Sequence, residues 1–206
     1  MTAPNIKFRN CFTATTISLI FVWGLLGTPA APVTAAPEIL LERYSNGRIH
    51  FEIEVDEQQQ PHGWSREYSE AGILKAERHY EHGVRDGTSR LYYTTGELMT
   101  AWGYRNDKRH GPSLGYYKSG RLKDKGMYLN DLLEGTVFKY YTDGTLKARM
   151  NFKHDLLEGE STIYFKNGQV QYIYRYFKGQ LWTRKDYSPD GKPLRKQEFL
   201  RPPLQP

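Results

Sequence analysis

Short stretches of alternating apolar and polar residues, each followed by a turn signal, run along most of the chain. Between positions 146 and 152 the apolar residues occupy every second position, with Lys147, Arg149 and Asn151 between them. Successive side chains of a strand point to opposite faces of a sheet, so the pattern predicts a strand with Leu146 and Phe152 on one face and these polar residues on the other. No segment longer than a few residues has a helical spacing of apolar positions. The pattern therefore predicts an all-β fold.

Two series of glycines repeat with a period of 24 residues, the second nine positions after the first. The first series is Gly63, Gly87, Gly111, Gly135 and Gly159, and the second is Gly72, Gly96, Gly120, Gly144 and Gly168. Between them lie aromatic pairs such as Tyr92–Tyr93, and a leucine or valine follows two residues after each second glycine. We interpret the glycines as structural residues that accept a left-handed backbone in turns. A fixed period of this kind is typical of a repeat protein.

Each repeat unit reads as two strands and two turns. The first turn ends at the second glycine, as in Thr94-Thr95-Gly96, and the second turn is a polar pair such as Asn130-Asp131. Consecutive strands joined by tight turns pair in an antiparallel manner. We therefore predict an elongated, single-layer antiparallel β-meander of hairpin repeats with about a dozen strands.

The unit Gly-x4-Tyr-Tyr-x2-Gly-x-Leu, followed by a tyrosine and an Asn-Gly-like turn, resembles the MORN repeat, and specifically its bacterial variant. The resemblance covers roughly residues 44–199. It implies a twisted single-layer sheet that contacts proteins or membrane surfaces without catalysis of its own. Bacterial chains of this kind often carry the label of a YwqK-like antitoxin. This sequence departs from the usual pattern in a longer second half and in aspartate at the second turn, at Asp107, Asp131 and Asp155.

Residues 1–35 are interpreted as a signal peptide. Lys7 and Arg9 precede a short apolar run at 17–26, and small residues end at Ala35, where we expect cleavage. The expected location is therefore the periplasm or the exterior, and an uncleaved membrane anchor is the alternative. Cys11 lies within the leader, so the mature chain would contain no cysteine for disulfides or thiolate chemistry.

The rest of the chain is divided into segments according to how closely each follows the repeat pattern. We expect a degenerate N-terminal capping unit at 36–62 and five full repeats at 63–182. A degenerate C-terminal capping unit would follow at 183–200, and a disordered tail at 201–206. Atypical outer units are what a repeat array needs to close its ends.

Composition and charge narrow the class of partner. The chain has a net charge of +6 and a pI of about 9.2, and aromatic residues make up 14% of it, with 16 tyrosines. This mild positive excess favours an acidic protein partner, with a membrane surface or the cell wall as alternatives, and it is too diffuse to indicate nucleic acid. The residues that we expect to contact a partner are exposed aromatic and basic side chains. They are Tyr93, Tyr117, Tyr141, Lys123, Lys147, Arg149 and Arg175.

No catalytic, metal or cofactor site is predicted. His62 and His110 occupy the same register in different hairpins. Equivalent positions even in successive hairpins lie two strands or about 9.5 Å apart, which one metal ion cannot bridge. The chain has no Gly-x-Ser-x-Gly, phosphate-binding loop or His-Glu-x-x-His motif. The sequence therefore predicts a non-enzymatic, exported binding protein. An immunity protein or antitoxin against one toxin and a structural adaptor at the envelope are the two alternatives.

Overall fold

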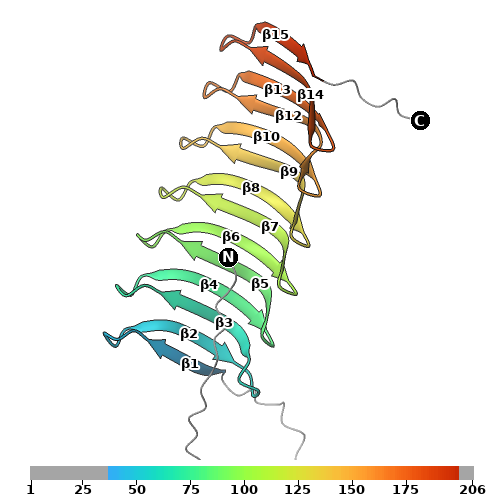
Figure 1. Ribbon diagram of the computed structural model, residues 1–206. Helices are drawn as coiled ribbons and strands as arrows, with labels where there is room; N and C mark the ends of the chain where they lie inside the picture. Colours follow the sequence, from blue (N-terminus) through green and yellow to red (C-terminus); the bar gives the residue numbers. More distant parts are fainter. Residues whose placement is uncertain (1–36, 200–206) are drawn as a thin grey trace, which may run out of the picture. The chain divides into compact units, whose positions relative to one another are not determined.

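The computed structural model describes residues 37–199, and every regular element in this range is a β-strand (Figure 1). The strands are β1 (Glu38–Arg43), β2 (Ile49–Val55), β3 (Pro61–Tyr68), β4 (Leu74–Glu81), β5 (Val84–Tyr92), β6 (Leu98–Arg105), β7 (Lys108–Tyr116), β8 (Leu122–Leu129), β9 (Leu132–Tyr140), β10 (Leu146–Lys153), β11 (Leu156–Leu157), β12 (Gly159–Tyr164), β13 (Val170–Phe177), β14 (Gln180–Tyr187) and β15 (Pro193–Glu198). The predicted leader and tail lie outside the described residues. No helix in the described part is long and apolar enough to cross a membrane.

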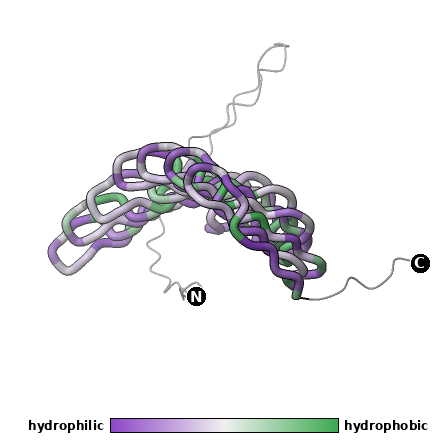
Figure 2. The backbone as a smooth tube through the Cα atoms, turned by 90° about the horizontal axis from the view of Figure 1, so that it is seen from above, coloured by the Kyte–Doolittle hydropathy of each residue, from purple (hydrophilic) through white to green (hydrophobic). Residues whose placement is uncertain are grey.

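All strands belong to one antiparallel sheet whose spatial order follows the chain. The path runs from β1 to β10 and on through β12 to β15, and the two-residue β11 pairs only with β10. The predicted all-β meander is confirmed. The expected number of about a dozen strands was too low, because the flanking segments also form full strands and a short break separates β11 from β12. Seen from above, the described residues form a curved single layer (Figure 2).

The two faces of the sheet differ in burial. Residues paired across strands share a face, so the register places most of the small buried side chains, with Thr162 as an exception, on what we call the serine face. It carries Ser65, Ala76, Ser89, Val137, Ala148 and Ser161. The opposite surface, which we call the arginine face, carries Arg66, Glu77, Arg90 and Arg149. A single layer has no second sheet to form an apolar core, so its stability depends on the backbone ladder and on contacts between neighbouring strands.

Every repeat unit contains a β-bulge near the start of its second strand. In β10, Leu146 pairs with Tyr140 and Ala148 pairs with Lys139, which leaves Lys147 as an extra residue. Because Tyr140 and Lys139 face opposite sides, Leu146 and Ala148 do too. The prediction of one uninterrupted alternation from Leu146 was therefore wrong. The extra residues of the five units are Lys75, Met99, Lys123, Lys147 and Gln171.

The ten repeat glycines all have positive φ angles, between 71° and 101°. The second turns use two consecutive residues in the same left-handed region, for example Asn106 at 49° and Asp107 at 64°. That backbone is typical of a two-residue hairpin turn whose twist matches the strands, and aspartate tolerates it better than most residues. The aspartates noted in the sequence thus occupy a position where glycine would be the conformational default.

The turns line two long sides of the sheet, and along each side a series of hydrogen bonds joins successive hairpins. At the edge of the second turns, which we call the aspartate edge, Asp107 Oδ1 accepts hydrogen bonds from Arg85 N and Nε at 3.1 and 3.0 Å. The amide of Asp107 donates to the carbonyl of Arg85, and Asp131 makes the same contacts with Arg109. Each net hydrogen bond contributes about 1 kcal/mol, which offsets the cost of a left-handed aspartate.

At the opposite edge, which we call the tyrosine edge, a tyrosine hydroxyl reaches the next unit. Tyr93 donates to the carbonyl of Tyr116 at 2.8 Å, and Tyr117 donates to that of Tyr140 at 2.7 Å. Tyr141 repeats the contact with Tyr164 at 2.8 Å. These hydroxyls satisfy carbonyls at strand ends, where the ladder leaves an acceptor free. The second tyrosine of these three pairs therefore has a structural role along this edge.

Candidate interaction surface

One row of laterally paired residues crosses the arginine face from end to end. Each member lies opposite the next in the register of the sheet, and we call the set the lateral row. From β1 to β15 it consists of Leu41, Glu52, Arg66, Glu77, Arg90, Ala101, Leu114, Lys125, Phe138, Arg149, Thr162, Ile173, Lys185 and Lys196. Acids alternate with arginines in its first part. From Leu114 to Thr162, cations alternate with uncharged residues; Ile173 and two lysines follow, and the row has no acid after Glu77.

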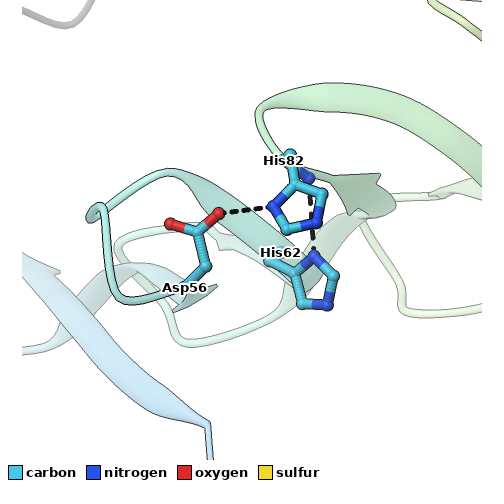
Figure 3. Close-up of side chains that lie close together, drawn as sticks. All are labelled: Asp56, His62 and His82. Carbon is cyan, nitrogen blue, oxygen red and sulfur yellow. Dashed lines mark hydrogen bonds and ion pairs between the residues drawn. The ribbon is translucent and has the colours of Figure 1, made fainter.

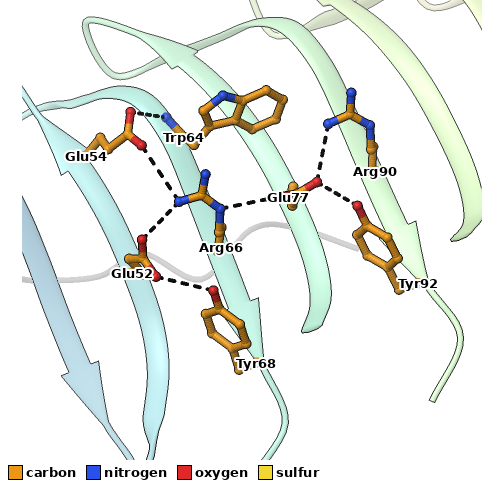
Figure 4. Close-up of polar contacts among 8 residues, drawn as sticks. All are labelled: Glu52, Glu54, Trp64, Arg66, Tyr68, Glu77, Arg90 and Tyr92. Carbon is orange, nitrogen blue, oxygen red and sulfur yellow. Dashed lines mark hydrogen bonds and ion pairs between the residues drawn. The ribbon is translucent and has the colours of Figure 1, made fainter. Parts of the chain in front are cut away.

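The N-terminal part of the lateral row is a connected network (Figure 4). Arg66 Nη1 donates to Glu52 Oε1 at 2.9 Å, and its Nε lies 3.4 Å from Glu77 Oε1. Glu77 Oε2 accepts from Arg90 Nη1 at 3.3 Å and from the Tyr92 hydroxyl at 2.6 Å. Each carboxylate is therefore shared between strands, and the charges in this part of the face satisfy one another.

Neighbouring side chains extend the network beyond the row. The Tyr68 hydroxyl donates to Glu52 Oε2 at 3.2 Å, and the amide of Trp64 donates to Glu54 Oε2 at 3.0 Å. The guanidinium of Arg90 lies 5.2 Å from the centre of the Trp64 ring, within the range of a cation–π contact. Each of the acids Glu52, Glu54 and Glu77 thus has at least two polar partners, which leaves little unpaired charge for an external partner.

The network shifts the ionisation of its members in a consistent direction. Burial alone would raise the pKa of Glu77, but hydrogen bonds from Tyr92 and Arg90 outweigh it and hold that pKa below its ordinary value. Burial, together with the hydrogen bond to Glu77, raises the pKa of Tyr92 to about 12. Both shifts stabilise the charged carboxylate and the neutral phenol, which is the arrangement the hydrogen bond requires.

The C-terminal part of the row places a ring where the N-terminal part has an acid. Phe138 lies between Lys125 and Arg149 in the register, as Glu77 lies between Arg66 and Arg90. The ammonium of Lys125 lies 5.0 Å from the centre of the Phe138 ring. Within residues 37–199, Lys125 forms no salt bridge, and its side chain is exposed.

The remaining cations of this region share a single carboxylate. Glu160 lies 3.9 Å from Arg149 Nη2 and 3.8 Å from Arg175 Nε, and all three side chains are exposed by more than a third. Such long, solvated pairs contribute little to stability. Next to them, Met127 of β8 shares the face of Lys125 and is 49% exposed. The surface around Phe138, Lys125, Met127 and Arg149, which we call the Phe138 patch, is therefore cationic and partly apolar.

The residues predicted to contact a partner do not form one cluster. Arg149 and Arg175 lie together on the arginine face beside Glu160. Lys123 and Lys147 are the extra residues of two bulges, outside the regular pairing. The ammonium of Lys147 lies 5.5 Å from the centre of the Tyr141 ring. The predicted basic stripe is therefore divided between the Phe138 patch and the bulges.

The three predicted tyrosines lie along the tyrosine edge and are half-buried. Their hydroxyls are used by the inter-unit hydrogen bonds described above, while their rings stay accessible to cations: Lys118 lies 5.7 Å from the centre of the Tyr93 ring, and Lys166 lies 5.9 Å from that of Tyr141. A contact role for these rings stays a prediction. Sequence reasoning missed Phe138, whose position between two cations depends on the bulges that set the register.

In four of the five units, the residue before the first-series glycine accepts a hydrogen bond from a backbone amide in the next second turn, whereas His110 contacts the side chain of Asn130. Asp86 Oδ2 accepts from the amide of Asn106 at 3.3 Å, and Glu134 Oε2 accepts from that of His154 at 2.8 Å. His62 takes this role through Nδ1 toward the amide of His82, at 3.4 Å. The turn after β4 brings His82 beside His62. The large distance between equivalent positions of different hairpins therefore does not apply to these two histidines.

The comparisons with known proteins agree with the periodicity. The family model of the MORN repeat variant matches residues 133–154 and 157–178. Residues 133–178 carry two adjacent MORN-type repeats. The two matched repeats lie one 24-residue period apart, and the first of them includes Phe138 and Arg149.

Other comparisons add little to this MORN assignment. No curated protein matches the chain significantly. Among solved structures, the crystal structure of the GtfA/B complex bound to UDP and GlcNAc aligns with 15% sequence identity and a TM-score of 0.27. The alignment covers 68% of this chain and 27% of that one, so the chain spans about a quarter of that protein's length. A likeness this weak supports no statement about fold or function.

Proposed function

We propose that this MORN-repeat chain is an exported, non-catalytic binding protein and that the Phe138 patch is its contact surface for an acidic protein partner. The observation that carries the proposal is the change along the lateral row, from closely paired acids and arginines to exposed cations around a ring, of which Lys125 has no salt bridge within residues 37–199 and Arg149 only a long, solvated one. Aromatic residues and arginine are enriched at protein interfaces, and an accessible ring between cations offers both apolar area and charge complementarity.

Export is the second part of the proposal. It rests on the leader-like pattern of residues 1–35, with two cations before a short apolar run and small residues ending at Ala35. Fractionation of expressing cells should place the protein outside the cytoplasm, with Ala36 as its first residue by N-terminal sequencing. An intact Met1 on membrane-bound protein would instead support an uncleaved anchor.

An immunity role is the narrower form of the same proposal. In that form the acidic partner would be one toxin, bound tightly in the periplasm, and an adaptor role would replace the toxin by an envelope protein. A partner identified in the experiment below decides between the two, because a toxin and an envelope-assembly protein differ in sequence and in toxicity to cells that lack this chain.

The structure supplies a matched pair of charge reversals that tests the contact surface. Lys125→Glu with Arg149→Glu removes one cation from β8 and one from β10 on the Phe138 patch. Lys123→Glu with Lys147→Glu removes one cation from each of the same strands, at the bulges. The two double variants change the net charge equally, so only the position of the charge differs.

Envelope extract is passed over each immobilised protein, and the captured partner is quantified by mass spectrometry. We expect the partner to bind wild type and the bulge variant and to be lost, by at least tenfold, from the patch variant. Binding should also weaken as salt rises, since exposed charges are screened beyond roughly 10 Å at 0.1 M ionic strength. If both variants lost the partner equally, net charge alone would explain the loss of binding, and the assignment of the contact to the Phe138 patch would be contradicted.

A further inference from the structure

Two histidines and an aspartate from different hairpins meet at the end of the sheet where β2 and β3 are joined (Figure 3). Asp56 follows β2, His62 lies in β3, and His82 begins the turn after β4. One ligand atom of each residue lies within 4.8 Å of the others. The imidazole centroids of the two histidines are 4.6 Å apart.

The carboxylate of this cluster is held in place by the backbone. Asp56 Oδ1 accepts from the amides of Gln58 and Gln60 at 3.0 and 2.9 Å, and its Oδ2 lies 2.8 Å from His82 Nδ1. The hydrogen bond from the Gln60 amide, followed by that from His82, keeps the pKa of Asp56 below its ordinary value. The Asp56 side chain is 9% exposed and that of His82 is 63% exposed. One side of the cluster is thus fixed by the turn and the other is open to water.

We propose that Asp56, His62 and His82 bind a divalent cation of the zinc class, with water completing the coordination. Two imidazoles and one carboxylate form a donor set that suits zinc and its neighbours and disfavours magnesium or calcium. Tetrahedral coordination at about 2.1 Å requires ligand atoms roughly 3.4 Å apart. The exposed His82 can close the remaining distance, at most about 1.4 Å, by rotating its side chain.

The site depends on a local departure from the repeat. The turn between β2 and β3 spans Asp56 to Gln60 and is longer than the two-residue second turns of the later units. In the next two units Asn106 and Asn130 occupy the position of His82, and His154 and Lys178 occupy it in the two units after those. A bound ion would therefore cross-link the first two hairpins at one end of the array, and a ligand that binds only the folded state stabilises it.

The repeat provides the substitutions for a test. His82→Asn installs the residue that the same turn position carries in later units with a φ close to 50°, so the turn is kept while one ligand is removed. Asp56→Asn keeps an oxygen for the two amides and removes the charge. His110→Gln and His50→Gln serve as controls: His110 has the register of His62, and His50 pairs with Glu42 at 3.1 Å without a second histidine.

Zn²⁺ is titrated into the untagged chain by isothermal calorimetry, with circular dichroism as the check on folding. We expect one ion per chain for wild type and both controls, at least tenfold weaker binding for His82→Asn, and weaker binding for Asp56→Asn. Zn²⁺ should also raise the melting temperature of wild type and not that of folded His82→Asn. The proposal is overturned if wild type shows no saturable 1:1 binding, if His82→Asn binds as wild type does, or if a control loses as much affinity. None of these outcomes bears on the Phe138 patch.

Discussion

Glu77 and Phe138 occupy the same kind of position in the sheet, each between two cations on the arginine face. Glu77 neutralises Arg66 and Arg90 and also accepts a hydrogen bond from Tyr92, with only 17% of its side chain exposed. Phe138 provides a ring to Lys125 and leaves the charges of both its neighbours without an acid in the row. Glu77 lies on the second strand of its unit (β4) and Phe138 on the first strand of its unit (β9), so what the two positions share is a pair of cationic neighbours in the register. The side chain between the two cations decides what the surface can do in each place.

The comparison separates a stabilising region from a binding region within one repeat scaffold. Cross-strand ion pairs that are partly buried hold neighbouring strands together, whereas exposed unpaired cations add nothing to folding and remain free for a partner. In a solenoid-like array each unit contacts only its neighbours, so one part of the face can give up internal pairing while the rest of the sheet stays folded. Function then follows from side-chain substitution within a repeated position.

The largest expected effect comes from deletions at the junction of the two regions. Removing one period, residues 111–134, places Gly135 in the register of Gly111, and Phe138 then faces Ala101 where Leu114 did. Strand direction and faces are preserved, so this variant should stay soluble with its β circular dichroism. Removing only 111–122 deletes one strand, reverses the direction of the next and misplaces its buried side chains.

The half-period variant should therefore aggregate or be degraded. Solubility and circular dichroism of both deletions, measured side by side, check the expectation. Equal damage by the two deletions would mean that the units are interlocked, and the picture of independent regions on one array would fail.

Reciprocal substitution of the two compared residues should have an asymmetric effect on stability. Glu77→Phe leaves two guanidiniums and a phenol without their acceptor and should lower the free energy of unfolding by about 2 kcal/mol. Phe138→Glu loses packing of a half-buried ring but gains two cross-strand ion pairs, so its net change should stay within about 1 kcal/mol. Chemical denaturation of both variants measures the difference. Equal losses of unfolding free energy would show that Glu77 does not stabilise the sheet more than Phe138 does.

The pH dependence of stability should also come mainly from the N-terminal region. The folded pKa of Glu77 lies below the ordinary 4.5, so its contribution is present above pH 4.5 and is lost as the pH falls through the folded value. The folded pKa of Tyr92 is about 12 against an ordinary 10.0, so its contribution is present below pH 10 and is lost as the pH rises through about 12.

The alkaline part can be isolated with Tyr92→Phe. The difference in tyrosinate absorbance between wild type and this variant should titrate near pH 12. A difference curve centred at the ordinary value of 10.0 would argue against the hydrogen bond between Tyr92 and Glu77.

The periodic features of the fold were predictable because they depend on local chemistry. Glycines every 24 residues gave the unit, and alternation gave strands in antiparallel order. The bulges at Lys123 and Lys147 were not predictable, because an extra residue in a polar stretch leaves no signature in composition. Since the bulges decide which residues oppose each other, the position of Phe138 between Lys125 and Arg149 stayed hidden.

Two further features were missed for the same kind of reason. The contact of Asp56 with His82 depends on one longer turn, between β2 and β3, which the period does not predict. The proximity of His62 and His82 follows the period, as that of Asp86 and Asn106 does, but becomes visible only once the hairpins are stacked. The tyrosines of the aromatic pairs looked like display residues, and the inter-unit bond of Tyr93 to the Tyr116 carbonyl becomes visible only once the hairpins are stacked. The 24-residue period predicts the strands and turns of the sheet. It does not predict the side chains that make the Phe138 patch or the cluster of Asp56, His62 and His82.

Site-specific photo-crosslinking tests most directly which surface meets the partner. A crosslinking residue is placed at Met127 on the Phe138 patch, at Lys139 on the serine face of β9, and at Thr88 on the arginine face of the N-terminal region. All three positions leave the row itself unchanged. A crosslinked partner at Met127, with little or none at Lys139 and Thr88, is the predicted result. Crosslinks at Lys139 or Thr88 without any at Met127 would place the contact elsewhere and contradict the account.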